Sequence, residues 1–278
     1  MIYLVLAIVS SALISIVMRV SSQKVKNNIG MLSVNYLTCL VMGGAFTGFT
    51  NLFPESPNLP LTLGLGSING FLYLLSFVLF QLSVKKNGVV LSSVFMKLGL
   101  LVPLVLSIVF FAEVPTWMQI AGFIIAVAAI ILINLQKSSE NSRMGLGLVA
   151  LLIAGGCADA MSKVYEQFGA SSLSSRFLFY TFVVAFVLCT CYMLIKKQRI
   201  GKNEALFGVL IGIPNFFSAK FLLVSLGSIP AVVAYPTFSV ATILLVSLVG
   251  VAVFKEKLSK RQYAGIAAIL VSLVLLNI

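Results

Sequence analysis

The segment Asn87–Asn134 occurs a second time in the chain, without a gap, as Pro230–Asn277. When the first segment is shifted by 143 positions, 11 of the 48 aligned positions carry the same residue. Each copy contains two long apolar stretches joined by a short polar link. In a chain of 278 residues, a repeat spaced at about half the length indicates a duplicated bundle. In a membrane, such a duplication is typical of a transporter whose binding site lies between the two halves.

The composition excludes a water-soluble fold. Apolar residues make up 60% of the chain and charged residues only 9%, whereas a soluble domain carries about 25% charged residues. The net charge of +12 does not indicate nucleic-acid binding, because the Lys and Arg residues stand in short links between apolar stretches. That pattern is typical of loops that face anionic lipid. The chain has no His, and its four Cys lack metal-ligand spacing, so we expect no metal and no cofactor.

Ten apolar stretches have the length of about 20 residues that a helix needs to cross the hydrocarbon core. We therefore predict an all-α integral membrane protein with ten transmembrane helices. The stretches cover approximately residues 2–20, 30–50, 60–83, 88–111, 116–135, 144–166, 174–195, 205–227, 230–253 and 261–277. The polar stretch Gln136–Arg143 separates them into two five-helix repeats, which we predict to be domains 1–138 and 144–278.

The Lys and Arg residues predict the direction of insertion. Fifteen of the 19 lie in odd-numbered links or at their helix ends, and only Arg176 lies in an even-numbered one. The positive-inside rule places the odd links in the cytoplasm, so both termini are predicted outside the plasma membrane. Because each half has five helices, the second half must enter the membrane in the opposite direction. The two repeats are therefore predicted to be inverted copies.

The link between the fourth and fifth predicted helices of each half carries the motif F-x-E-x-x-[ST]-x-x-Q-x-x-G. Its positions are Phe111, Glu113, Thr116, Gln119 and Gly122 in the first half, and Phe254, Glu256, Ser259, Gln262 and Gly265 in the second. The Thr or Ser with a Gln three residues later predicts a capping box. The Glu is expected near the positive end of the helix that follows, and the Gly lets helices approach closely. We interpret this motif as structural.

With ten predicted helices in two halves and this motif in each, the chain resembles the drug/metabolite transporter superfamily, in its EamA-like branch. The first helix of each half is also similar to that family, because small residues precede a basic residue, Arg19 or Lys163, near its end. The resemblance implies a membrane carrier for small metabolites that works by alternating access around a central cavity. It implies no particular substrate, because the superfamily transports amino acids, sugar nucleotides, phosphate esters and cationic drugs.

Three ionisable residues lie deep inside predicted helices: Lys97, Asp159 and Lys220. Such residues are costly in lipid and usually mark function. Lys97 is expected near the midplane without an acidic partner at its depth, where it either contacts the substrate or is a solvated structural lysine. Asp159 and Lys220 are expected at equal depth, as a structural ion pair or as part of the substrate site. Lys163, nearer a helix end, is expected to extend to the headgroups.

Polar uncharged side chains complete the candidate substrate site. They are Asn69, Tyr73, Asn215, Tyr235 and Ser239. The first two share one face of a helix because they are four residues apart. The others lie beside Pro214 or Pro236, where a proline within a helix frees a carbonyl group next to a cavity. The alternative for each tyrosine is ordinary helix packing.

These features predict a secondary active transporter for a small polar metabolite that bears a carboxylate or phosphate, either amino-acid-like or an organic anion. Its partners would be that substrate, membrane lipid, and protons or a counter-substrate, with Asp159 as the candidate proton carrier. One alternative is an efflux carrier for drugs or organic cations, with Asp159 or Glu166 as the acidic site. A second is a lipid flippase or an accessory membrane subunit. The absence of His and of a metal cluster speaks against an enzyme.

Overall fold

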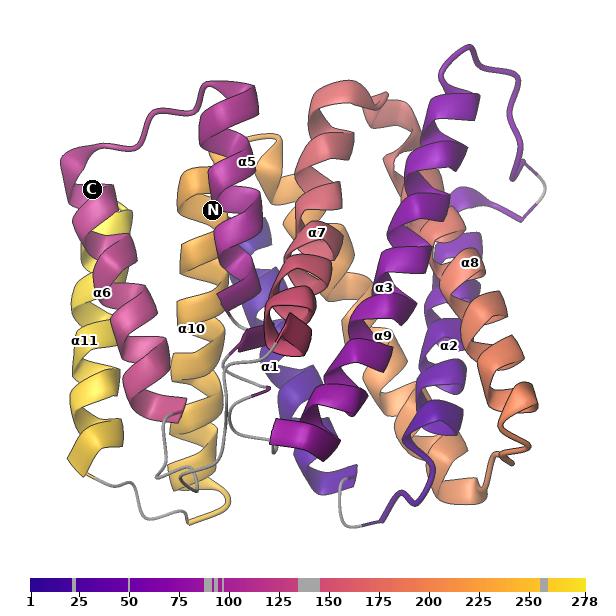
Figure 1. Cartoon of the computed structure of the whole chain (residues 1–278). Helices are drawn as coiled ribbons and strands as arrows, with labels where there is room; N and C mark the ends of the chain where they lie inside the picture. The colour runs from indigo at the N-terminus through magenta and orange to yellow at the C-terminus, as the bar shows by residue number, and fades with distance from the viewer. Residues whose placement is uncertain are drawn as a thin grey trace. The chain divides into compact units, whose positions relative to one another are not determined.

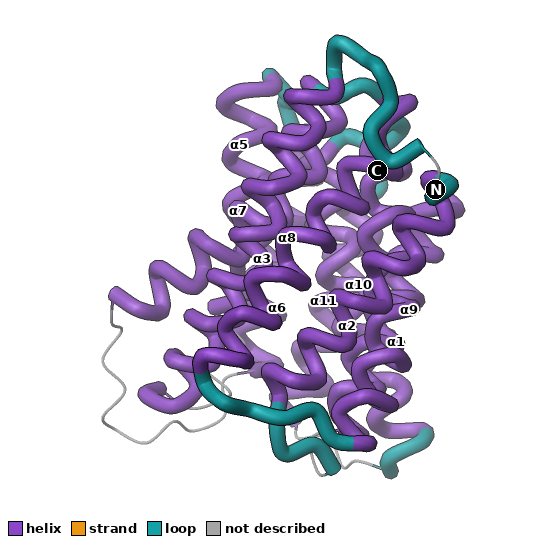
Figure 2. Tube along the Cα trace, turned by 90° about the vertical axis from the view of Figure 1, so that its right-hand side faces the viewer, coloured by secondary structure: helices purple, strands orange, loops and turns teal. Residues whose placement is uncertain are grey.

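The computed structural model describes residues 1–21, 24–49, 51–87, 92, 95–96, 98–134, 146–255 and 260–278. This part of the chain forms helices joined by short links and contains no strand (Figure 2). The elements are α1 (Ile2–Ser21), α2 (Asn28–Thr47), α3 (Leu59–Asn87), η1 (Leu98–Leu100), α5 (Leu101–Phe111), α6 (Trp117–Asn134), α7 (Leu146–Phe168), η2 (Ser171–Leu173), α8 (Ser174–Ile195), α9 (Lys202–Leu226), α10 (Ala231–Ala252) and α11 (Lys260–Leu276) (Figure 1).

A helix lies at each of the ten predicted positions, and the all-α membrane fold is confirmed for the described part of the chain. Seven helices are long and apolar enough to cross a membrane by length and composition: α1, α2, α3, α7, α8, α9 and α10. The fourth predicted span differs, because its described end is a 3-10 turn, η1, followed by the 11-residue α5. A count of ten spans therefore stays a prediction.

Local hydrogen bonds and backbone conformation determine where α2 begins and ends. The side chain of Asn27 caps α2, because its Oδ1 accepts hydrogen bonds from the backbone N–H groups of Ile29 and Gly30 at 3.1 and 3.0 Å. The helix ends at Gly48, whose φ of 65° suits a residue without a Cβ atom. Pro214 and Pro236 lie within α9 and α10, and both helices continue through them.

The chain forms two compact units, each of which takes helices from both halves of the sequence. Unit 1 consists of Met1–Leu74 and Val164–Ser225. Unit 2 consists of Leu75–Lys163 and Leu226–Ile278. We predicted that the two sequence repeats, 1–138 and 144–278, are the domains of the protein, and this stays a prediction.

Within unit 1, α2 packs against α8, which occupies the equivalent place in the second half (Figure 1). Near the start of α2, Ser33 Oγ lies 2.7 Å from Thr190 Oγ1, late in α8. Near the end of α2, a Cβ atom on Gly43 would lie 3.3 Å from the Phe179 Cα atom, early in α8. The two equivalent helices therefore run in opposite directions.

Within unit 2, α6 packs against α11, again its equivalent in the other half (Figure 1). Ser272 Oγ, late in α11, donates a 2.9 Å hydrogen bond to the carbonyl of Gly122, early in α6. A Cβ atom on Gly122 would lie 2.9 Å from the Leu275 Cβ atom. This pair is antiparallel too, and Gly122 permits the close approach that the motif predicted.

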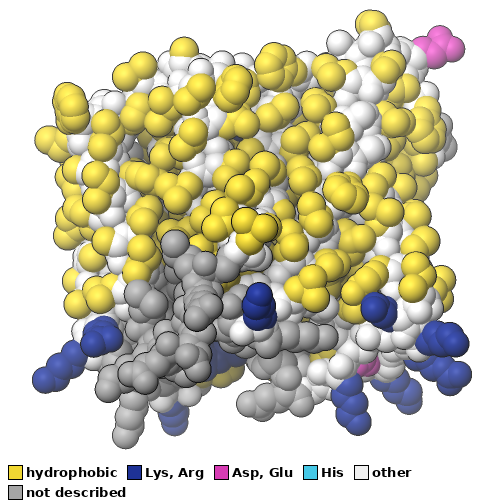
Figure 3. Space-filling model, viewed as in Figure 1, with side chains coloured by type: hydrophobic (Ala, Val, Ile, Leu, Met, Phe, Trp, Pro, Cys, Tyr) yellow, Lys and Arg dark blue, Asp and Glu magenta, His cyan; other side chains and the backbone are white. Residues whose placement is uncertain are grey.

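Hydrogen bonds group the basic links at one end of unit 1. They run from Asn203 Nδ2 to Lys24 O at 2.9 Å and from Asn27 Nδ2 to Arg199 O at 3.0 Å. The same end carries Lys and Arg side chains below apolar helix flanks (Figure 3). Arg176 lies at the other end of the unit, where its Nη2 donates to Asn51 O at 3.0 Å. The positive-inside rule expects the basic links to gather at one membrane face, as they do here. That this end of the unit faces the cytoplasm stays a prediction.

Replacing Gly70 with alanine is expected to destabilise unit 1, because α3 approaches α8 closely at this point. The new Cβ atom would lie 2.5 Å from Thr181 O and 2.7 Å from Val184 Cβ, and such overpacking costs about 1–3 kcal/mol. The matched control is Gly64→Ala on the same helix, where nothing lies within 4 Å. Thermal unfolding in detergent should show a lower midpoint for Gly70→Ala only; equal midpoints for the two variants would contradict this packing.

Candidate functional site

The predicted site residues fall into two groups that belong to different units. Asn69, Tyr73, Asn215 and Lys220 lie in unit 1, whereas Asp159, Tyr235 and Ser239 lie in unit 2. Lys97 lies outside the described residues, as do Glu256 and Ser259 of the second motif copy. The pairing of Asp159 with Lys220 would join the two units and stays a prediction.

In unit 1, the ammonium group of Lys220 lies against aromatic rings. Its Nζ atom is 3.2 Å from the centroid of the Phe46 ring and 5.9 Å from that of Phe216. The negative face of an aromatic ring attracts a cation, and the attraction grows when the cation is removed from water. These rings therefore stabilise the half-buried charge without neutralising it.

The rings belong to a larger group, here named the aromatic cluster, which joins α2, α3, α8 and α9. Its members are Tyr36, Phe46, Tyr73, Phe182 and Phe216. Tyr73 lies 6.2 Å from Tyr36 and 6.1 Å from Phe182, measured between ring centroids. Phe182 lies 6.2 Å from Phe216, and Phe216 stacks on Phe46 at 5.4 Å. The structure thus brings two predicted residues, Tyr73 and Lys220, to one aromatic cluster.

The two asparagines predicted in unit 1 differ in their surroundings. Asn215 Nδ2 donates a 3.2 Å hydrogen bond to Asn35 Oδ1 and so ties α9 to α2. Asn69 is 2% exposed, and its Oδ1 has no hydrogen-bond partner in the described part of the chain. Asn215 therefore contributes to helix packing, whereas Asn69 keeps an unused acceptor.

In unit 2, a hydrogen bond joins α7 and α10 at the predicted acidic residue. The Tyr235 hydroxyl donates to the backbone carbonyl of Asp159 at 2.9 Å. Tyr235 is buried, Ser239 one turn later is half-buried, and the Asp159 side chain is exposed. The hydrogen bond uses the main chain of Asp159, so it fixes this turn of α7 without involving the carboxylate.

Unit 2 also contains a buried ion pair that sequence reasoning missed. Lys163 Nζ lies 2.9 Å from Glu113 Oε1, and the two side chains are 4% and 14% exposed. The other carboxylate oxygen, Oε2, accepts a 3.0 Å hydrogen bond from the backbone N–H of Val232, in the first turn of α10. One carboxylate therefore holds the ends of α5 and α7 at the start of α10, where it complements the positive helix terminus.

This ion pair corrects two expectations. Lys163 was expected to extend to the headgroups, which is wrong because its ammonium group is buried against Glu113 and lies 5.8 Å from the Phe111 ring centroid. Glu113 was expected to act at the start of the next helix, α6, but its partner is the start of α10. The sequence signal that could have revealed the pair is the basic residue placed at the same point of the first helix in each half.

The capping box predicted from the motif is confirmed in its first copy. The backbone N–H of Thr116 donates to Gln119 Oε1 at 3.0 Å, and the N–H of Gln119 donates to Thr116 Oγ1 at 3.2 Å. These reciprocal bonds satisfy two groups that a helix start otherwise leaves unpaired. They start α6 at Trp117.

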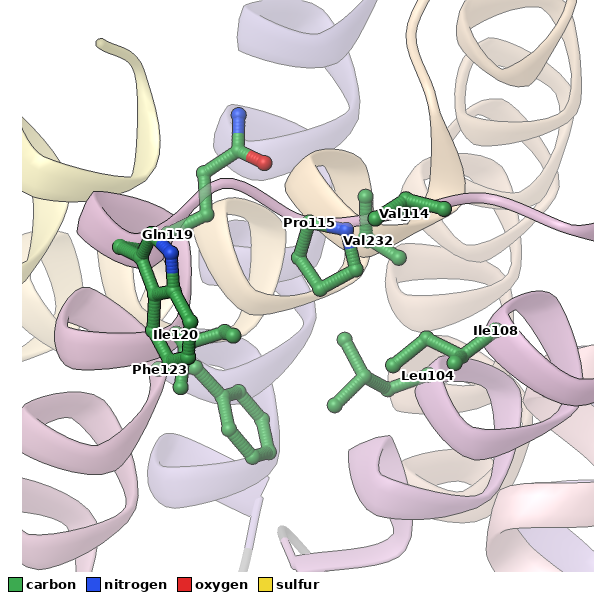
Figure 4. Close-up of a pocket in the computed structure, with 9 residues that line it drawn as sticks. Leu104, Ile108, Val114, Pro115, Gln119, Ile120, Phe123 and Val232 are labelled. Carbon is green, nitrogen blue, oxygen red and sulfur yellow. The ribbon is translucent and has the colours of Figure 1, made fainter.

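An apolar cavity of about 540 Å³ lies in unit 2, between α5, α6 and the start of α10. Leu104, Ile108, Phe123 and Val232 are among the side chains that line it (Figure 4). The amide of Gln119 turns away from these side chains, since it closes the capping box (Figure 4). Walls of this kind accept aliphatic groups and offer nothing to a charged metabolite.

Comparisons with known proteins identify the family of this chain and support its fold. The sequence profile of the EamA-like transporter family matches residues 1–135 and 143–278. An uncharacterized protein of Haemophilus influenzae (strain ATCC 51907 / DSM 11121 / KW20 / Rd) is 24% identical over 277 residues, which cover 95% of this chain and 93% of that protein. A crystal structure, described only as that of a protein, has a TM-score of 0.73 at 14% identity and covers 99% of this chain and 94% of its own; this likeness supports the fold alone.

Proposed function

Because this chain belongs to the EamA-like transporter family, and is thus a membrane transporter of the drug/metabolite type, we propose that it is a secondary active carrier. Its substrate in this proposal is a small polar metabolite that bears a carboxylate or a phosphate. The carrier works by alternating access, with two inverted five-helix repeats that rock about a central site.

The observation that carries this mechanism is the opposite direction of equivalent helices. Within unit 1, α2 and α8 are antiparallel, and within unit 2 the same holds for α6 and α11. In a third pair of equivalent helices, the end of α5 lies at the start of α10, where Glu113 accepts a hydrogen bond from the N–H of Val232. Two copies that enter a membrane in opposite directions produce antiparallel equivalents, whereas two copies inserted in the same direction produce parallel ones. The pairs therefore support an inverted repeat.

The surroundings of Lys220 support an anionic substrate. The partners described above are aromatic rings, which do not offset a positive charge, so the ammonium form of Lys220 can attract a carboxylate or a phosphate. Lys97 is proposed as a contact for an anionic group of the substrate. Asp159 is proposed as the proton carrier, with its position fixed by Tyr235.

Replacing Lys97 with alanine is expected to weaken substrate binding by about 10-fold or more, because a hydrogen bond to a charged group is lost. Lys97→Arg keeps the charge and is the matched control, with binding close to that of the wild type. Thermal-shift titration of the purified carrier with amino acids, phosphate esters, nucleotide sugars and quaternary amines measures both. Equal affinities for Lys97→Ala and the wild type would remove Lys97 from the site.

The apolar cavity favours a second candidate, lipid flipping, because its walls suit an acyl chain. Proteoliposomes separate the two candidates. A carrier for soluble metabolites exchanges a radiolabelled solute across the bilayer and leaves fluorescent phospholipid in its leaflet, whereas a flippase moves the phospholipid and no solute. Thermal stabilisation by quaternary amines in place of anions would instead favour efflux of organic cations.

A further inference from the structure

Asn69 in α3 carries a buried hydrogen-bond acceptor that the described part of the protein leaves unused. The residue is 2% exposed, and its Oδ1 atom has no partner there. Buried polar groups in native proteins are nearly always paired, so each exception needs an explanation. An acceptor left open in this way costs stability until something from outside the chain completes it.

A second buried asparagine in unit 1, Asn35, has hydrogen-bond partners for its side-chain oxygen. Asn35 is also 2% exposed. Its Oδ1 accepts hydrogen bonds from Asn215 Nδ2 at 3.2 Å and from Cys39 Sγ at 3.9 Å. Two other buried side-chain oxygens, Ser107 Oγ and Gln198 Oε1, also lack a partner in the described part of the chain, and Asn69 differs from them in lying next to Tyr73 of the aromatic cluster.

The position of Asn69 on α3 connects it to the aromatic cluster. It lies between Gly66 and Gly70, whose added Cβ atoms would lie 2.9 Å from the Tyr180 Cβ atom and 2.5 Å from Thr181 O, so this face of α3 lies against α8. One turn later, on the same face, Tyr73 contacts Tyr36 and Phe182. The open acceptor therefore lies beside one end of the cluster.

The other end of the aromatic cluster carries the positive charge. Phe182 leads to Phe216 at 6.2 Å between ring centroids, and Phe216 lies 5.9 Å from Lys220 Nζ. Unit 1 thus places two different polar groups at the two ends of the aromatic cluster, whose linking rings Phe182 and Phe216 are buried. The first is a neutral hydrogen-bond acceptor and the second is a cation.

We propose that Asn69 Oδ1 accepts a hydrogen bond from the transported molecule. The substrate then carries an N–H or O–H donor in addition to the anionic group that Lys220 attracts. This class includes amino acids and hydroxy acids, and it excludes simple carboxylates. The inference rests on the proposed function, because it names the substrate of the same site.

The first test measures stability without any substrate, in two matched variants. Asn35→Leu removes the partner of Asn215 and is expected to lower the thermal midpoint in detergent. Asn69→Leu removes an unpaired acceptor and is expected to keep or raise that midpoint. If the thermal midpoint of Asn69→Leu falls as far as that of Asn35→Leu, the proposal is overturned. Such a fall would show that Asn69 Oδ1 already accepts a hydrogen bond from another group of the protein or from a buried water.

The second test measures ligand selectivity by thermal-shift titration with alanine, lactate and propionate, whose donor and carboxylate are adjacent, and with the ω-amino, ω-hydroxy and unsubstituted acids of four and six carbons, whose two groups stand further apart. The wild type is expected to bind the amino or hydroxy acid about 10-fold or more tightly than the unsubstituted acid. Asn69→Leu should lose this preference and still bind the carboxylate. Comparison of the amino with the hydroxy members identifies the donor as an ammonium or a hydroxyl group.

The outcomes separate the two proposals. If the wild type binds acids and Asn69→Leu retains the same preference among them, the role of Asn69 is overturned and the anionic substrate class stands. If the folded wild type binds no member of the panel and no phosphate ester, the proposed substrate class fails, and the role of Asn69 fails with it.

Discussion

Replacing Glu113 with alanine is expected to destabilise the protein by about 3–5 kcal/mol, because the change removes the carboxylate that forms an ion pair with the buried ammonium group of Lys163. The backbone N–H of Val232 loses its acceptor at the same time, so the first turn of α10 is weakened as well. Chemical or thermal unfolding in detergent measures the loss.

The matched control removes both charges together. The double variant Glu113→Leu with Lys163→Met fills a similar volume without a buried charge, and such replacements are often neutral. We expect it to recover most of the stability lost in Glu113→Ala. If the double variant is as unstable as the single one, the pair has no electrostatic role, and the loss comes from packing and from the lost acceptor of the Val232 N–H group.

Replacing Asp159 with asparagine is expected to abolish proton-driven accumulation of substrate, so that flux under a pH gradient falls to the level of empty liposomes. Asparagine has the same shape but cannot carry a proton. The fold should persist, because the Tyr235 hydroxyl donates to the main-chain carbonyl of residue 159, which asparagine retains. Flux in proteoliposomes and the thermal midpoint, measured on the same preparation, separate loss of coupling from loss of structure.

Two further variants make the Asp159 experiment decisive. Asp159→Glu retains a titratable carboxyl group and should keep part of the accumulation. Tyr235→Phe removes the hydrogen bond and should lower the flux while the carboxylate remains. Full accumulation by Asp159→Asn under a pH gradient would remove Asp159 from the mechanism.

Most of the helical fold could be predicted from the sequence, because lipid leaves the backbone few choices. A spanning segment must satisfy its own N–H and C=O groups, so long apolar stretches become helices. The predicted span 174–195 matches α8, and the span 230–253 matches α10 within a residue at each end. The capping box of Thr116 and Gln119 was equally predictable, since its bonds join residues three apart.

Contacts between distant residues could not be predicted in the same way. Glu113 and Val232 are 119 positions apart, and no local pattern indicates that one carboxylate bonds the start of α10. The 3-10 turn η1 was also missed, because it depends on the close approach of Gly99 to α7, where an added Cβ atom would lie 3.0 Å from Gly156 N. The aromatic surroundings of Lys220 come from α2 and α9 together.

The sequence located the candidate site residues but not their partners. Lys220 and Asp159 were predicted as site residues because they are ionisable groups inside apolar helices, where such groups are costly and usually mark function. The difference between Asn35 and Asn69 is invisible in the sequence, because both are asparagines in apolar helices. Only the packing of α2 against α9 supplies Asn35 with its partner.

Labelling of two single cysteines tests the central claim, opposite insertion of the two repeats, most directly. In a variant that lacks the four native cysteines, Lys24→Cys and Gln167→Cys mark exposed positions at the end of the first helix of each half, the first just after α1 and the second in the last turn of α7. A membrane-impermeant maleimide applied to intact cells should label Gln167→Cys and spare Lys24→Cys until the membrane is opened. Labelling of both positions from the same side would contradict the inverted repeat and the alternating-access mechanism built on it.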